Sequence, residues 1–406
     1  GRIVLAEGNP AAACARSPRV SEVDPAGASS VDMARAERAL DDLLDLGGVA
    51  APHELPRLVD DTALALGAVA AVIHLVDLQQ VALTPFPEPG HPPVTELPAP
   101  LVIDSTIAGR VYQHDEVIVQ TTSDAGAPVT VWLPLRDGAD RLGVLAVALQ
   151  EPSLVEDADS PTSRLLRRLA AITSDLIAQR SRYGDSIIAA TRTTEVTLAA
   201  EIQWGLLPPL TFESTQVAVA GLLEPAYDVA GDSIDYAVDP GVVHLAIFDG
   251  MGHGLRSAQL AILAVSAYRN ARRSGHSLTT TASDVDQAVE AGFGGEAYTT
   301  SVLAQLDTDT GYLSWVNAGH PEPLLLRGGA LVRSLHTGPD LPFGIGLREG
   351  DAPYEVGSEQ LQPGDHVLFY TDGVVEGHAP GGEQFGVERL VDLLARNVAD
   401  NLSAAE

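Results

Sequence analysis

The chain of 406 residues contains no lysine, so all 24 of its basic residues are arginine. A Walker A loop, a protein kinase and a Schiff-base enzyme each require a lysine side chain. The sequence therefore excludes these three classes of mechanism. Codon bias explains the absence equally well, so the missing lysine supports no positive assignment.

Cysteine is nearly absent as well. Cys14 is the only one, so no disulfide can form within the chain, which is typical of a protein of the reducing cytoplasm. The sequence has no run of about 20 apolar residues that could cross a membrane. No basic-plus-apolar signal segment opens the chain. Because the first residue is Gly1 rather than methionine, we expect a processed or trimmed chain.

Positive charge is scarce relative to negative charge. The chain has 55 acidic residues and a net charge of −31. Such a surface repels nucleic-acid phosphates and anionic lipids, so we expect no binding to nucleic acid and none to membranes. Aromatic residues make up 5% of the sequence and hydrophobic residues 45%, which predicts mostly aliphatic cores.

Length and composition divide the chain into four parts. At roughly 100–200 residues per domain, the length indicates two or three domains. Residues 1–30, rich in Ala, Pro, Ser and Gly, are predicted to be a flexible N-terminal segment. We assign residues 31–152 to a first α+β domain, 153–208 to a helical linker, and 209–406 to a second domain with many strands.

The first domain shows two helical patterns followed by apolar strands. The predicted elements are a helix over 33–46, a helix over 55–66 and a strand over 70–76. The clearest hairpin covers 129–149, with the turn dipeptide Asp137-Gly138 between its strands. Within it, residues 132–145 resemble the central hairpin of GAF domains, which implies a sensor of a small molecule or a protein. The alternative is an α+β spacer without a ligand.

The predicted linker begins with a helix over 163–182 that carries a heptad-like apolar stripe. The stripe consists of Leu165, Leu169, Ile172 and Leu176. A second helix is predicted over 186–206, before two prolines. A stripe of this length is either an ordinary packing face or the seam of a parallel homodimer stalk, and both interpretations stay open.

Three aspartates of the second domain stand at the ends of apolar runs and beside glycines. They are Asp232, Asp249 and Asp372. An ionised carboxylate at the end of a buried strand is costly unless it is solvated, paired or bound to a metal. A neighbouring glycine lets the backbone approach a ligand closely. Oxygen ligands select Mg²⁺ or Mn²⁺ over Zn²⁺, and two such ions about 3.5–4 Å apart can activate water for attack on a phosphoryl group. A single Asp-Gly pair is in contrast usually a turn.

Ordered sequence blocks from Ala199 onward resemble the PPM (protein phosphatase 2C-like) superfamily, specifically its bacterial branch of stage II sporulation protein E-type phosphatases. The blocks are 201–209, 229–232 with Asp235, 249–254, 317–321, 361–373 and 385–386. The resemblance implies an αββα sandwich of two antiparallel sheets that hydrolyses phosphoserine or phosphothreonine in a protein. It also implies that the substrate is a phosphorylated anti-anti-sigma (STAS-type) regulator of a partner-switching pathway.

The resemblance also assigns roles by position. Asp249 would bridge two Mn²⁺ or Mg²⁺ ions, the carbonyl of Gly250 would bind one of them, and Asp232 and Asp372 would complete the shells. His253 is a candidate general acid for the leaving alkoxide, because histidine side chains ordinarily titrate near neutral pH. The alternative for His253 is a loop residue that hydrogen-bonds the backbone.

The end of the sequence departs from the pattern of the family. The family usually ends with a strand carrying an Asp-Asp-x-Thr block, whereas residues 400–406 read as the end of a helix. A catalytically weak or inactive pseudophosphatase that acts as a sensing or scaffold protein is therefore the second hypothesis. His320 is predicted to fix a turn between strands rather than to act chemically. A metal-dependent nuclease is disfavoured by the acidic surface.

Overall fold

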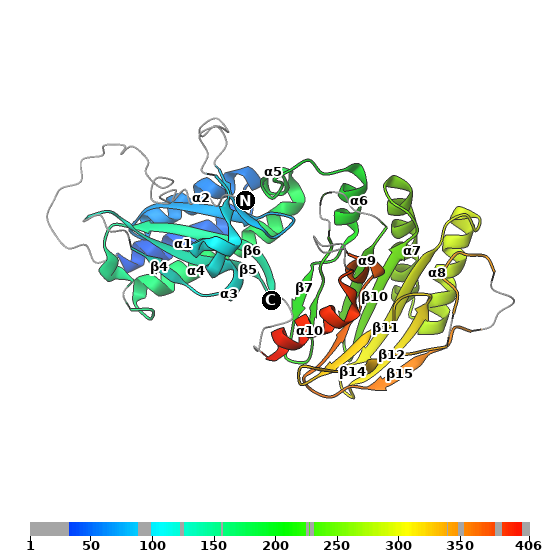
Figure 1. Cartoon of the computed structure of the whole chain (residues 1–406). Coiled ribbons are helices and arrows are strands. Elements are labelled where there is room, and N and C mark those ends of the chain that lie inside the picture. Colours follow the sequence, from blue (N-terminus) through cyan, green and yellow to red (C-terminus); the bar gives the residue numbers. More distant parts are fainter. Residues whose placement is uncertain are drawn as a thin grey trace. The chain divides into compact units, whose positions relative to one another are not determined.

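The computed structural model describes residues 32–87, 99–121, 126–155, 157–224, 227, 231–338, 340–347, 353–377 and 384–399. The chain divides into two compact units, Gly1–Thr194 and Glu195–Glu406 (Figure 1). Both units mix helices and strands, as the α+β assignment predicted. No helix in the described ranges is long and apolar enough to cross a membrane. The N-terminal segment 1–30 and the end of the chain, 400–406, lie outside the described residues.

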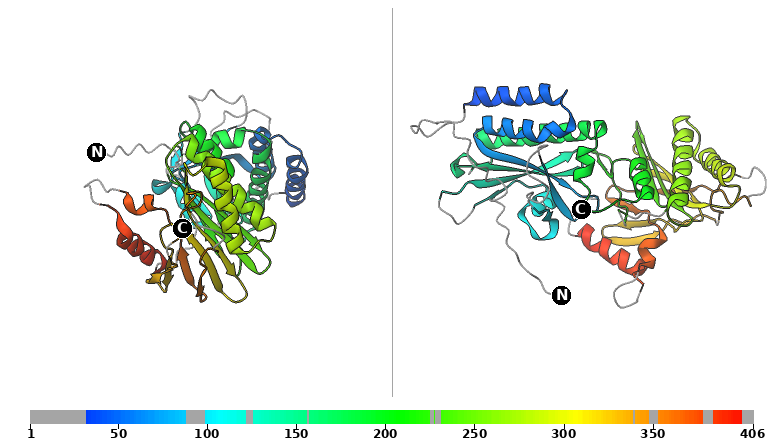
Figure 2. Two further views of the ribbon diagram at one scale, coloured as in Figure 1. Left: turned by 90° about the vertical axis from the view of Figure 1, so that its right-hand side faces the viewer. Right: turned by 90° about the horizontal axis from the view of Figure 1, so that it is seen from above.

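The first unit is built on a six-stranded antiparallel sheet of order β3-β2-β1-β6-β5-β4. Its strands are β1 (Ala68–Val76), β2 (Ala82–Phe86), β3 (Leu101–Val102), β4 (Ile118–Gln120), β5 (Val129–Asp137) and β6 (Asp140–Leu149). Helices cover both faces of this sheet. They are α1 (Met33–Gly47), α2 (Leu55–Ala65) and α4 (Pro161–Arg180) on one face and α3 (Ile107–His114) on the other. Figure 2 shows the blue helices α1 and α2 on one side of the strands.

The predicted elements of this unit are confirmed. Helices α1 and α2, strand β1 and the β5–β6 hairpin match the predicted ranges to within about two residues. Asp137 and Gly138 form the hairpin turn, and Gly138 has a φ of +60°, which a glycine adopts without strain. Short 3₁₀ turns occur at Pro52–Glu54, Ile103–Ser105, Pro152–Leu154 and Ser181–Tyr183.

Helix α4 is an integral part of the first unit, in contrast to the linker that the sequence predicted over 153–208. Its apolar stripe packs against α1, α2 and the sheet, so the four side chains that would form a dimer seam are only 0–9% exposed. They are Leu165, Leu169, Ile172 and Leu176. The structure therefore favours the ordinary packing face over the stalk for this stripe.

The single helix predicted over 186–206 is instead two helices, α5 (Ser186–Ala190) and α6 (Leu198–Leu206). The hydroxyl of Thr197 accepts a hydrogen bond from the amide of Ala200 at 3.2 Å, which caps and starts α6. The unit boundary after Thr194 falls between these two helices.

The second unit contains a five-stranded sheet of order β15-β12-β11-β10-β9, a three-stranded sheet β14-β13-β16 and the small pair β7–β8. The strands are β7 (Thr211–Glu213), β8 (Ala218–Ala220), β9 (Ser233–Asp239), β10 (Val242–Gly250), β11 (Thr299–Asp307), β12 (Tyr312–Ala318), β13 (Leu324–Arg327), β14 (Ala330–Ser334), β15 (Gly357–Gln360) and β16 (Asp365–Leu368). The remaining helices are α7 (Leu255–Arg273), α8 (Leu278–Phe293), α9 (Asp372–Glu376) and α10 (Gly386–Ala399).

Three apolar clusters show that this unit has four layers. Helices α7 and α8 pack on one face of the large sheet, for example through Tyr268 against Phe248. The other face of that sheet packs on the small sheet, where Val302 and Leu325 share a cluster. The outer face of the small sheet is covered by α10. The described strands are all paired antiparallel, so the predicted αββα sandwich is confirmed.

Candidate functional site

Two glycines bring the first pair of predicted metal-binding aspartates together. The amide of Gly250, the last residue of β10, donates to the carbonyl of Gly231 at 3.2 Å. A Cβ atom on Gly231 would lie only 2.5 Å from the carbonyl oxygen of Gly250, so a larger residue would push the two segments apart. Asp232 follows one glycine and Asp249 precedes the other, and this close backbone contact therefore places both carboxylates side by side.

The third aspartate reaches the same place from the small sheet. The segment after β16 carries Thr371, whose hydroxyl donates to Oδ2 of Asp232 at 2.8 Å. Asp372 is the next residue and the first of helix α9. Its charge acts on both Asp232 and Asp249. The structure thus gathers the three predicted carboxylates from the ends of separate strands.

The electrostatics of this cluster are unfavourable for three ionised carboxylates. Burial, then the charges of Asp232 and Asp372, and then hydrogen bonds to both of them raise the pKa of Asp249 to about 7. Burial raises the pKa of Asp232 as well, and the hydrogen bond from Thr371 opposes that rise. Among the described residues, no basic side chain contributes to either shift. The cluster therefore lacks a neutralising protein cation in the part of the chain that the structure describes.

These donors fit a hard divalent cation in kind, but they provide only part of a coordination shell. Within the described ranges, no group of three His, Cys, Asp or Glu side chains already has the arrangement of a metal site. Mg²⁺ commonly binds through one or two carboxylates and keeps several water ligands. A cation would also offset the mutual repulsion that raises the pKa of Asp249. Carboxylate, main-chain carbonyl and water oxygens together would complete the shell.

The remaining predicted site residues are Gly250 and His253. Gly250 is buried, and the next amide, that of Met251, donates to the carbonyl of Tyr298 at 3.0 Å. His253 is exposed in the loop between β10 and α7.

Comparison with known proteins bears on the second unit. Residues 239–405 match the family described as Stage II sporulation protein E (SpoIIE). This part of the chain is therefore similar to the SpoIIE family. The match includes Asp249 and Asp372, whereas Asp232 precedes it.

Two curated relatives from Bacillus subtilis match over about half of this chain. They are the phosphoserine phosphatase RsbU, 22% identical over 49% of this chain and 59% of its own length, and the phosphoserine phosphatase RsbP, 26% identical over 45% of each. The chain therefore spans about half the length of these relatives. Solved structures also show similarity. The SiaA-PP2C domain of Pseudomonas aeruginosa is 22% identical over 50% of this chain and 81% of that chain (TM-score 0.41), and a phosphotransferase GAF domain from Acinetobacter is 18% identical over 37% and 97% (TM-score 0.31).

The block around His320 forms a turn, as predicted, but the side chain that fixes the turn is that of Asn317. The side chain of Asn317 donates to the carbonyl of His320 at 2.9 Å and accepts from its amide at 2.8 Å. The imidazole of His320 points elsewhere and hydrogen-bonds the hydroxyl of Thr300 at 2.8 Å. Burial lowers the pKa of His320 to about 4, with the backbone of Tyr370 opposing the shift, so the ring is neutral at physiological pH.

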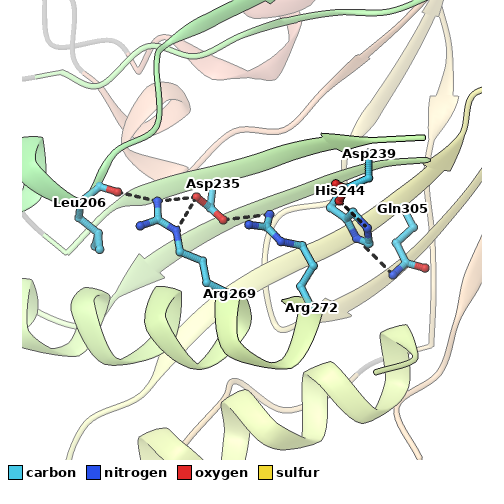
Figure 3. A network of polar contacts seen from close by, with 7 residues as sticks. All are labelled: Leu206, Asp235, Asp239, His244, Arg269, Arg272 and Gln305. Carbon is cyan, nitrogen blue, oxygen red and sulfur yellow. Dashed lines mark hydrogen bonds and ion pairs between the residues drawn. The ribbon is translucent and has the colours of Figure 1, made fainter. Parts of the chain in front are cut away.

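Asp235, which the sequence grouped with the first acidic block, does not join the cluster. It lies in β9 and faces α7, where both Nε and Nη2 of Arg269 donate to its Oδ1 at 2.9 and 2.6 Å. Nη1 of Arg272 lies 3.2 Å from its Oδ2 (Figure 3). This carboxylate is neutralised by two cations and is therefore structural.

Sequence reasoning also missed the threonines around the cluster. Thr299, Thr300 and Thr371 hydrogen-bond, respectively, the backbone of Asp249, the ring of His320 and the carboxylate of Asp232. Threonine is common in strands, so its presence alone gives no signal. The adjacent pair Thr299-Thr300 at the start of a strand was the only available hint.

Proposed function

We propose that this chain is a metal-dependent protein serine/threonine phosphatase that dephosphorylates an anti-anti-sigma (STAS-type) regulator in a partner-switching pathway. The observation that carries the proposal is the convergence of Asp232, Asp249 and Asp372 without a neutralising basic side chain among the described residues. The match of residues 239–405 to the SpoIIE family supports it, as do the two relatives named phosphoserine phosphatases.

The cofactor we infer is a pair of Mn²⁺ or Mg²⁺ ions. Asp249, Asp232, Asp372 and the carbonyl of Gly250 would hold these ions. A related structure, that of RsbX, was solved in complex with magnesium. When bound, such ions supply an activated water and neutralise charge on the phosphoryl group.

The side chains of this chain have their own tasks in the reaction. Asp249 gives up the proton that its raised pKa retains, so that the carboxylate becomes available as a ligand. His253, exposed in the loop after β10, would donate a proton to the leaving serine or threonine alkoxide. With ions bound, the carboxylates would hold the phosphoryl-binding site in place.

The experiment is phosphate release from a phosphoserine-bearing STAS protein, with and without Mn²⁺. We expect release only with Mn²⁺, and expect Asp232→Asn, Asp249→Asn and Asp372→Asn each to abolish it. The matched control is Asp137→Asn, which makes the same change in the hairpin turn of the first unit. If all four variants keep the wild-type rate, the cluster is not the active site.

A scaffold function remains the second candidate, because the described residues do not already form a complete metal site. A pseudophosphatase would bind the phosphorylated STAS protein without turnover. Calorimetry with Mn²⁺ separates the two candidates. Two bound ions together with phosphate release favour the enzyme, whereas binding of the STAS protein without release favours the scaffold.

For the first unit we propose a GAF-like sensor role that controls the phosphatase. It contains an aliphatic cavity of about 230 Å³ between edge strand β4 and helix α4, lined by residues that include Val119, Val131, Leu166 and Arg167. Val119→Trp fills this cavity, and we expect it to change the Mn²⁺-dependent rate of the full chain. Val69→Trp, at a 45% exposed position of β1, is the control. Equal rates in the two variants would contradict a regulatory cavity.

A further inference from the structure

We propose that Thr299 and Thr300 are positioning residues that hold the metal-binding segments from opposite faces of strand β11. The inference rests on the proposed function, because it concerns how the carboxylates are kept in place for a divalent cation. Neither threonine contributes a ligand of its own in this proposal. Each acts through a hydrogen bond to a neighbouring group.

The alternation of a β-strand explains how two adjacent residues can serve two different segments. Successive side chains of a strand point to opposite faces of the sheet. Leu303 of β11 belongs to the cluster formed with α7 and α8, which places Thr299 on the helix-covered face. Val302 belongs to the cluster between the two sheets, which places Thr300 on the face toward the small sheet.

Thr299 fixes the end of strand β10. It is fully buried, and its hydroxyl donates to the carbonyl of Asp249 at 2.9 Å. It pairs with Gly250 in the β10–β11 ladder, and its own amide and carbonyl both bond to Phe343 on the other side, at 3.0 and 2.9 Å. The backbone of Thr299 is thus clamped from two sides, and its hydroxyl sets the orientation of the peptide that joins Asp249 to Gly250.

Thr300 supports the segment that carries Asp372. Its hydroxyl hydrogen-bonds Nδ1 of His320 at 2.8 Å, and His320 is only 6% exposed. The ring of His320 is close enough to the backbone of Tyr370 for that backbone to affect its protonation. Two residues after Tyr370 comes Asp372, and between them Thr371 holds Asp232. The pair Thr300–His320 therefore supports the backbone at Tyr370, two residues before the third carboxylate.

Ser301 provides a matched control on the same strand. It is fully buried like Thr299 and lies on the same face, and its hydroxyl donates to the carbonyl of Ile247 at 2.7 Å. Ile247 precedes Asp249 by two residues and belongs to the apolar cluster between the sheets. Removing the Ser301 hydroxyl costs a buried hydrogen bond of the same kind without touching a metal-binding segment.

The test is Mn²⁺ affinity of the full chain, measured by calorimetry for Thr299→Val, Thr300→Val and Ser301→Ala. Residues that orient metal ligands typically change metal affinity about 10–100-fold when they are removed. We expect losses of about 10–100-fold for both valine variants and of less than about threefold for Ser301→Ala. All three melting temperatures should fall by a similar amount, about 2–4 °C.

Conservative variants add a readout that a purely structural role would not move. Thr299→Ser and Thr300→Ser keep the hydroxyl, so we expect both to restore Mn²⁺ affinity to within about threefold of the wild type. Wild-type affinity in the valine variants would overturn the proposal. So would a loss in Ser301→Ala as large as theirs.

The same measurement separates this inference from the proposed phosphatase activity. If the variants show the expected affinity pattern but the wild type releases no phosphate, positioning stands and the phosphatase function fails. If the wild type releases phosphate with Mn²⁺ while the valine variants bind Mn²⁺ normally, the function stands and positioning fails. A wild type that binds no Mn²⁺ overturns both.

Discussion

Two carboxylates of the second unit lie three residues apart in the sequence and meet opposite surroundings. Asp235 faces the helix layer and is held by Arg269 and Arg272. Asp232, just before the same strand, faces two other carboxylates and the hydroxyl of Thr371. A neutralised carboxylate needs no further partner, whereas an un-neutralised cluster calls for a cation. The comparison therefore separates a structural aspartate from candidate functional ones.

The ion pairs of Asp235 also connect three elements of the unit. Arg269 donates to the carbonyl of Leu206 at 2.7 Å, at the C-terminal end of α6, as well as to Asp235 of β9 (Figure 3). The carboxylate of Asp235 is 1% exposed and the side chain of Arg272 is 8% exposed. This buried network joins α6, β9 and α7, and its role is the stability of the unit.

The largest effect is expected from breaking the geometry of the cluster without changing its charge. In Gly231→Ala the new Cβ would lie 2.5 Å from the carbonyl oxygen of Gly250, so Asp232 and Asp249 must move apart. A displacement of about 1 Å in an active site can cost on the order of 100-fold in rate. We therefore expect kcat/KM for Mn²⁺-dependent phosphate release to fall at least about 100-fold.

Gly205→Ala is the control for that variant, because a Cβ atom on Gly205 in helix α6 meets nothing within 4 Å. It should keep the wild-type rate. A wild-type rate in Gly231→Ala would show that close contact of the two glycines is not needed for catalysis.

Removing the charge of Asp235 should lower the stability of the protein rather than its activity. Asp235→Asn leaves two arginines without their counter-charge in a buried site, and breaking a buried pair costs about 3–5 kcal/mol. We expect a loss of about 3 kcal/mol in the free energy of unfolding, measured by urea denaturation. The rate per folded molecule should stay near the wild-type value. A loss of activity without a loss of stability would instead indicate that Asp235 is a functional residue.

The sequence predicts the un-neutralised carboxylates well. Asp249 ends an apolar run and adjoins a glycine, and that pattern alone indicates a buried strand end that needs a ligand. The hairpin of the first unit is predictable for a similar local reason, since Asp137-Gly138 lies between two apolar strands. Local patterns of this kind hold because the strand and the turn are encoded by neighbouring residues.

The partners of these carboxylates depend on contacts between distant parts of the chain, which the local sequence does not reveal. Asp235 meets Arg269 across 34 residues, and Thr371 meets Asp232 across 139. The local sequence around Asp235 is as acidic as that around Asp232, so the two were grouped together. Helix α4 was misplaced for a related reason, because an apolar stripe does not reveal whether it faces a sheet or a second helix.

A pH titration sharpens the comparison further. The pKa of Asp249 is about 7 in the folded protein and near 3.8 in the unfolded chain. The folded state therefore binds this proton more tightly than the unfolded chain does. As a result, the protein loses stability as pH rises from about 4 to about 7. Asp249→Asn removes this loss. Without metal, the variant should therefore become more stable than the wild type as pH rises through this window, by about 1–2 kcal/mol after solvent screening.

The measurement is the melting temperature of both proteins at several pH values, in buffer with chelator. The difference between them should be small near pH 4 and level off above pH 7. Saturating Mn²⁺ should reverse it, because only the wild type gains the full binding free energy of the metal. A difference that does not depend on pH would show that Asp249 has no raised pKa.

The smallest effect is expected at a paired carboxylate whose partner is partly in solvent. Asp365 accepts two hydrogen bonds from Arg327, at 2.6 and 2.7 Å, between strands β16 and β13. Hydrogen bonds from Arg327 lower the pKa of Asp365, so this pair stabilises the protein above the unfolded pKa and loses that contribution as pH falls. Since Arg327 is 36% exposed, solvent screens the pair, and Asp365→Asn should cost only about 1 kcal/mol at pH 7 by urea denaturation. A cost as large as that of Asp235→Asn would mean that pairing geometry, rather than burial of the arginine partners, sets the stability of these carboxylates.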